Sequence, residues 1–123
     1  MSQQMSRLVS TGGLVVGSAL GLAGTFIPSP SARGLLWGLD GVALVVAAAL
    51  LTVHYFRQGH DTVAAGFLVF AVGESLVLAT AAMELTGSGP VFGAGVSLWA
   101  GSLFLLSGPQ VAAIWVRAVG AIA

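Results

Sequence analysis

The chain has 123 residues, of which 57% are hydrophobic and only 7% are charged, and its formal net charge is zero. A soluble domain carries roughly 25% charged residues because its surface faces water, so this composition excludes an ordinary soluble domain. The four arginines lie far apart in the sequence, which excludes a basic nucleic-acid-binding patch, and the absence of cysteine excludes disulfides and thiolate metal sites.

Four apolar stretches are long enough to cross a bilayer, which takes about 20 predominantly apolar residues. The first covers residues 8–27 and ends at a proline-containing turn. Its apolar run is longer than the ~7–15 residues of a signal peptide, so we expect it to be a retained span. The second stretch covers residues 35–56 and the third covers residues 62–85. Gly59 suits the end of the second helix and Asp61 suits the N-cap of the third, which predicts a tight antiparallel hairpin.

The fourth stretch begins near Val91 and has two interpretations. It continues to residue 116 with a kink at Pro109, or it ends at residue 107 and restarts as a short interfacial helix. We favour the restart because the residue before a proline is disfavoured in helical geometry. The sequence therefore predicts an all-α integral membrane bundle of four transmembrane helices, forming one domain over residues 1–123.

The basic residues predict the orientation, since they are enriched on the cytoplasmic side of membrane proteins. Arg7, Arg57 and Arg117 fall on one side of the predicted bundle, whereas Arg33 falls on the other. We therefore expect both termini in the cytoplasm. The chain contains no lysine and no asparagine, a bias typical of a GC-rich genome, so we expect a bacterial cytoplasmic membrane.

Small residues four apart let transmembrane helices approach closely. Two predicted helices carry such stripes, which consist of Gly13, Gly17 and Gly21 in the first and of Gly93, Ser97 and Gly101 in the fourth. Packing within the chain is the interpretation we favour for both stripes. The alternative is an interface with another membrane subunit or with a second copy of the chain.

Glu74 is the strongest candidate for an intramembrane functional group. It lies about twelve residues from either end of the predicted third span, and therefore near the middle of the membrane. An ionised carboxylate there costs several kcal/mol without a partner, so we expect it to be protonated, hydrogen-bonded or facing a wet cavity. One interpretation is a proton- or cation-coupled site. The other is a neutral carboxyl group that fixes helix register by bonding to Ser75, Thr80 or a backbone carbonyl.

Asp40 is the second intramembrane carboxyl group. It lies about 9 Å below the outer end of the second helix, at ~1.5 Å rise per residue. Arg33 is close enough in sequence to reach it, so we expect an interfacial ion pair or a helix cap. Because the second and third helices are antiparallel, we also expect Asp40 and Glu74 to lie at similar depths and to line one polar track.

The remaining polar residues do not indicate an enzyme. His54 and His60 are six residues apart and do not share a helix face, so we expect neither a metal site nor haem. The sequence contains no P-loop, no nucleotide-binding glycine fingerprint and no catalytic triad pattern. We therefore expect no catalytic residue, no cofactor and no nucleic-acid partner.

Two functions agree with these features. The favoured one is a non-catalytic packing or accessory subunit of a larger membrane complex, because the small-residue stripes and short loops suit close helix packing. The alternative is an oligomeric transporter or channel for a small solute or ion, with Glu74 as its proton- or cation-coupling site. The expected partners are the lipid bilayer and either other membrane subunits or further copies of the chain.

Overall fold

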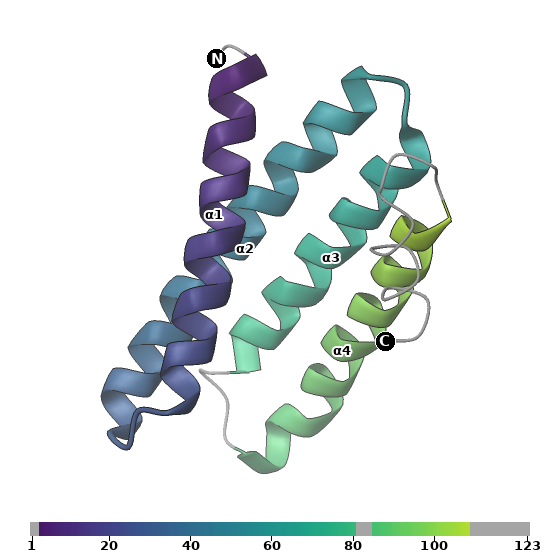
Figure 1. Ribbon diagram of the computed structural model, residues 1–123. Coiled ribbons are helices and arrows are strands. Elements are labelled where there is room, and N and C mark those ends of the chain that lie inside the picture. Colours follow the sequence, from purple (N-terminus) through teal and green to yellow (C-terminus); the bar gives the residue numbers. More distant parts are fainter. Residues whose placement is uncertain (1–2, 81–84, 109–123) are drawn as a thin grey trace.

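The computed structural model describes residues 3–80 and 85–108, and the regular structure within these ranges is all helical. The four helices are α1 (Gln3–Thr25), α2 (Pro30–Arg57), α3 (Asp61–Thr80) and α4 (Leu85–Ser107), and they alternate in direction (Figure 1). Each helix is long and apolar enough to cross a membrane. The prediction of four apolar helices is confirmed, and these candidate spans suggest a membrane location.

The turn between α1 and α2 is shorter than expected, because α2 begins at Pro30 rather than near residue 35. Ser29 is the N-cap, and its hydroxyl accepts a hydrogen bond from the Ala32 N–H at 3.5 Å. Proline is well tolerated at the first helical position, where its missing N–H has no partner within the helix. Pro30 therefore starts the helix that the sequence analysis placed five residues later.

The α2–α3 hairpin is closed by a glycine in left-handed conformation. Gly59 has φ +75°, its N–H donates to the Phe56 carbonyl at 3.1 Å, and the His60 N–H donates to the Tyr55 carbonyl at 3.0 Å. These two bonds satisfy carbonyl groups at the end of α2. Asp61 lies in the first turn of α3 rather than at its N-cap, where its negative charge still favours the helix dipole.

The start of α4, which follows the α3–α4 connection, differs from the prediction. α4 begins at Leu85, the residue expected to end the third span, and Pro90 lies inside the helix instead of before it. A proline this close to a helix N-terminus removes one backbone hydrogen bond without ending the helix. The predicted restart after Pro109 lies outside the described residues.

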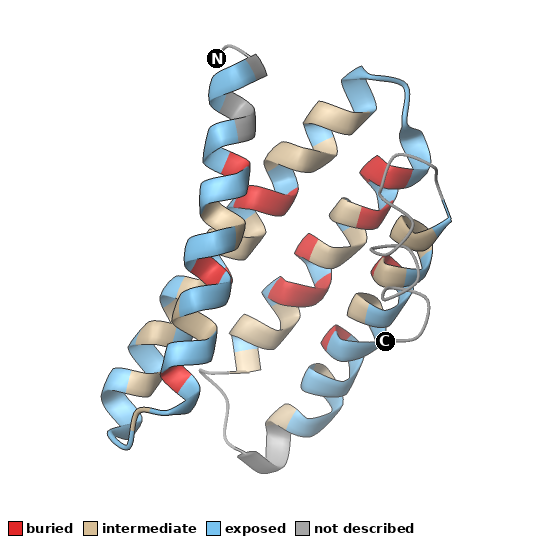
Figure 2. Ribbon diagram, in the orientation of Figure 1, coloured by how far each residue is buried: buried red, intermediate tan, exposed pale blue. Residues whose placement is uncertain are grey.

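The described helices form an open row rather than a closed bundle. α1 contacts α2, α2 contacts α3 and α3 contacts α4, but α1 and α4 do not contact each other. α3 has a neighbour on each side, and buried residues are most frequent along it (Figure 2). Close helix contacts are therefore limited to three consecutive pairs.

Large apolar side chains are exposed on every helix. They include Val15 on α1, Leu35 on α2, Leu68 on α3 and Phe104 on α4, the last of which is 78% exposed. Soluble monomers rarely expose such extended apolar surface, whereas lipid tails are its natural environment.

Candidate functional site

A cavity of about 790 Å³ lies between α2, α3 and α4. Asp40 and Glu74, the two carboxyl groups expected within the membrane, both lie on its wall. Its lining is otherwise largely apolar and aromatic, and it consists of Trp37, Gly38, Asp40, Leu44, Phe70, Glu74, Val77, Leu78, Thr80, Ser88, Gly89, Phe92 and Trp99.

Glu74 is the more deeply buried of the two acids, with only 5% of its surface exposed. At ~1.5 Å per residue it lies about 20 Å along α3 from Asp61 and about 9 Å from Thr80. The described part of α3 ends at Thr80, so the position of Glu74 near the middle of the predicted span stays a prediction. Its side chain extends toward α2, where Gly41 leaves room for the carboxyl group.

A close approach of α3 and α4 sets the position of Glu74 against the indole of Trp99. A Cβ atom at Gly73 would lie 2.9 Å from the Gly95 carbonyl oxygen, and one at Gly95 would lie 2.8 Å from the Gly73 carbonyl oxygen. Only two glycines permit this contact, since any side chain would separate the helices. Glu74 follows Gly73 directly, so the crossing point holds it at the α4 interface.

Trp99 supplies an unsatisfied donor beside Glu74. Its indole N–H lies near the Glu74 carboxyl group but is buried without a completed hydrogen bond. The ring stacks on Phe70 with centroids 6.3 Å apart.

Asp40 lies between the cavity and α1. Its carboxylate packs against Gly17 and Gly21, and its Oδ1 atom is buried without a hydrogen-bond partner. It is close enough to Glu74 for the two charges to repel each other when both groups are ionised. The structure thus brings Asp40 and Glu74 to one cavity.

The expected ion pair between Arg33 and Asp40 is absent from the described residues. The Arg33 guanidinium instead lies over the Trp37 ring, 5.6 Å from its centroid. Trp37 is held by its indole N–H, which donates to the Gly21 carbonyl at 3.3 Å. The cation–π contact satisfies Arg33 at the helix end and leaves Asp40 without a basic partner.

The hydroxyl groups expected to hold Glu74 bond within their own helix. The Ser75 hydroxyl donates to the Ala71 carbonyl at 2.8 Å, and the Thr80 hydroxyl donates to the Val77 carbonyl at 2.6 Å. Their protons are therefore not available to the carboxyl group.

The two small-residue stripes face different surroundings. Gly13, Gly17 and Gly21 face α2, and a Cβ atom at Gly17 would lie 3.0 Å from the Leu44 side chain. On α4, by contrast, Gly93 and Gly101 have open space, and the Ser97 hydroxyl bonds to its own helix. The stripe on α4 therefore does not pack against the described helices of this chain.

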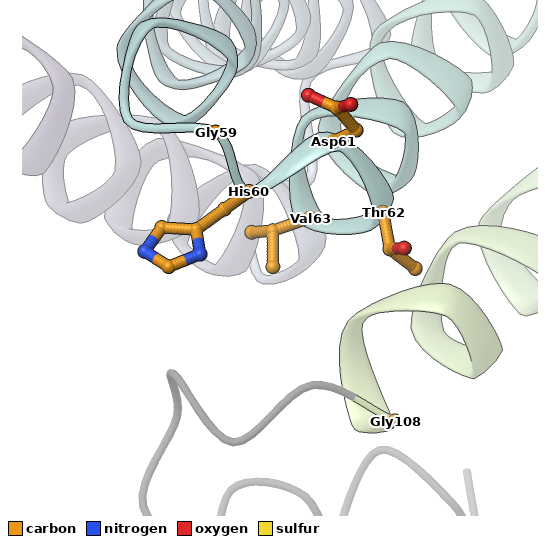
Figure 3. A pocket seen from close by; sticks show the side chains of 6 residues that line it. All are labelled: Gly59, His60, Asp61, Thr62, Val63 and Gly108. Atoms are coloured by element: carbon orange, nitrogen blue, oxygen red, sulfur yellow. The ribbon is translucent and has the colours of Figure 1, made fainter.

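A second hollow of about 380 Å³ lies at the opposite end, beside the α2–α3 hairpin and Gly108 (Figure 3). The His60 ring and the Asp61 carboxylate point away from each other there. His54 bonds to Gln58 at 3.2 Å. The described residues contain no group of three His, Cys, Asp or Glu side chains suited to a metal ion.

No sequence motif predicts that Trp37, Trp99, Gly73 and Gly95 are parts of the site. The glycine immediately before Glu74 was an available signal, since glycine beside a polar group in a span marks a close helix contact. The residue of α4 that contacts Gly73 depends on how α4 is rotated about its own axis. Because α4 is uniformly apolar, its sequence does not reveal that rotation.

Comparison with protein-family models, with curated proteins and with solved structures finds no match for this chain. Its function is therefore argued from the geometry of the cavity.

Proposed function

We propose that the chain is a small integral membrane transporter or channel for a solute or ion, with Glu74 as its proton- or cation-coupling group. The observation that carries this proposal is the cavity that holds both Glu74 and Asp40. Ionisable groups within a span are costly, and they typically mark substrate or ion pathways.

The cavity reaches from one end of the helices to the buried carboxyl group. Thr80, Ser88 and Gly89 line it near the α3–α4 connection, whereas Trp99 lies deeper in the row. A route of this kind is required for a coupling group, because the group must exchange a proton or cation with water. With both termini in the cytoplasm, as the arginines favour, the cavity opens toward the opposite side of the membrane.

A second candidate function is the accessory subunit of a larger membrane complex. The outward stripe on α4 supports it, since Gly93 and Gly101 offer a smooth surface that no described helix of the chain covers. An oligomeric transporter uses the same surface for contacts between copies, so the stripe alone does not separate the two functions. The cavity favours transport.

Reconstitution of the purified chain into liposomes tests the proposal. A transporter or channel produces proton or cation flux above that of protein-free liposomes without any other subunit. An accessory subunit produces none, and instead co-purifies from native membranes with other proteins in fixed stoichiometry. Absence of flux from a folded, reconstituted chain contradicts the proposal.

A further inference from the structure

We propose that the cavity binds a protonated amine that carries an aromatic or apolar body. This inference names the class of ligand for the site described above, and it rests on the proposed function for its role in transport.

The two acidic residues of the site favour a cation. Glu74 and Asp40 face one cavity, and no basic side chain of the described residues pairs with either of them. Arg33 is engaged with the Trp37 ring. An ammonium group between the two acids relieves their mutual repulsion and supplies the counter-charge that the chain does not provide.

The lining distinguishes an organic cation from a metal ion. Hard metal ions take about six or more oxygen ligands, whereas Asp40 and Glu74 are the only acidic residues among the described residues of this wall. Aromatic rings are more abundant, and they are Trp37, Phe70, Phe92 and Trp99. Ring faces attract cations electrostatically, most strongly where water is excluded, and the apolar remainder of the wall accepts an apolar body.

The size of the cavity agrees with this ligand class. Its volume of about 790 Å³ lies within the ~300–1,000 Å³ typical of small-molecule sites. A bare ion leaves most of that space unfilled, whereas an aromatic amine fills a substantial part of it. The ammonium then lies at the carboxyl groups, and the ring lies among the aromatic side chains.

Calorimetric titration of the full chain in detergent tests the inference with two probes of similar size. N,N-dimethylbenzylammonium is cationic at neutral pH, whereas N,N-dimethylbenzamide is neutral. We expect the cation to bind at least tenfold more tightly than the amide. Glu74→Gln should weaken cation binding at least tenfold and leave amide binding unchanged.

Asp61→Asn is the matched control, because it removes one carboxylate at the exposed hairpin outside the cavity. It should bind the cation as the wild type does. If Glu74→Gln does not fold, Asp40→Asn provides the same comparison. Equal affinity for the two probes, or cation binding that both cavity variants retain, overturns the inference.

Failure of the amine-binding inference can be distinguished from failure of the transport proposal. Glu74-dependent proton or alkali-cation flux without amine binding contradicts this ligand class but supports transport. Amine binding without flux in liposomes supports the ligand site and contradicts transport.

Discussion

Gly41 of α2 lies directly against the carboxyl group of Glu74. A Cβ atom at position 41 would lie 3.2 Å from Glu74 Oε1 and 3.1 Å from Leu78 Cδ1. Both distances are shorter than ordinary van der Waals contact. The burial of Glu74 between α2 and α3 therefore depends on the absence of a side chain at residue 41.

The Gly41→Ala variant should be less stable than the wild type. Alanine favours a helix over glycine by about 1 kcal/mol, but overpacking at a tight contact costs about 1–3 kcal/mol. Gly34→Ala is the control, because Gly34 lies on the same helix and has open space around it. Thermal unfolding in detergent should show a lower Tm for Gly41→Ala and no decrease for Gly34→Ala. Equal Tm shifts in the two variants contradict the close contact.

Replacement of Gly17 by leucine should disrupt the packing of α1 on α2. The new Cβ atom would lie 3.0 Å from the Leu44 side chain and 3.3 Å from Asp40 Oδ1. Gly12→Leu on the same helix serves as the control, since nothing lies within 4 Å of its Cβ position. We expect a loss of stability of about 1–3 kcal/mol for Gly17→Leu alone. If both variants unfold at the wild-type temperature, the face of α1 that carries Gly17 meets lipid instead of α2.

The sequence predicts the helices of this chain better than their contacts. Long apolar runs and the Gly59 turn define the four helices, because hydrophobicity and turn geometry are local properties. The start of α2 was predicted too late because the Ser29–Pro30 pair was interpreted as a break rather than as a capped helix start. The rotation of a helix about its own axis is set by tertiary contacts. Because α4 is apolar on all sides, its sequence does not reveal which face contacts α3.

The candidate site was predicted in part. Glu74 and Asp40 stood out because charges are rare in spans, and antiparallel neighbours bring them to similar depths. Arg33 was assigned to Asp40 from sequence proximity alone, whereas the structure gives it the nearer Trp37 ring. The indole of Trp99 is brought to Glu74 by the contact between α3 and α4, which no pattern in either helix specifies.

Replacement of Gly95 by alanine should separate α3 from α4. A Cβ atom there would lie 2.7 Å from Val77 Cγ2 and 2.8 Å from the Gly73 carbonyl oxygen. Gly101→Ala is the control, because its Cβ position on the same helix is open. Cysteine crosslinking between α3 and α4, or thermal unfolding, should show a defect only in Gly95→Ala. A defect of the same size in Gly101→Ala argues that the outward face of α4 packs against a partner.

The proposed orientation is tested with reporter fusions after residues 30, 59 and 88. Arg7, Arg57 and Arg117 on one side, against Arg33 on the other, predict that residue 59 lies in the cytoplasm and that residues 30 and 88 lie outside it. A reporter active only in the periplasm should therefore be active after residues 30 and 88 and inactive after residue 59. The reverse pattern overturns the orientation.

The most direct test of the account is the Glu74→Gln variant, measured for folding and flux in the same preparation. Glutamine keeps the shape of the side chain and its ability to form hydrogen bonds, but it removes the charge and the titratable proton. The account predicts a Tm close to that of the wild type in detergent and loss of proton or cation flux in liposomes, whereas Asp61→Asn retains flux. A folded Glu74→Gln variant with wild-type flux would contradict the role of Glu74 as the coupling group.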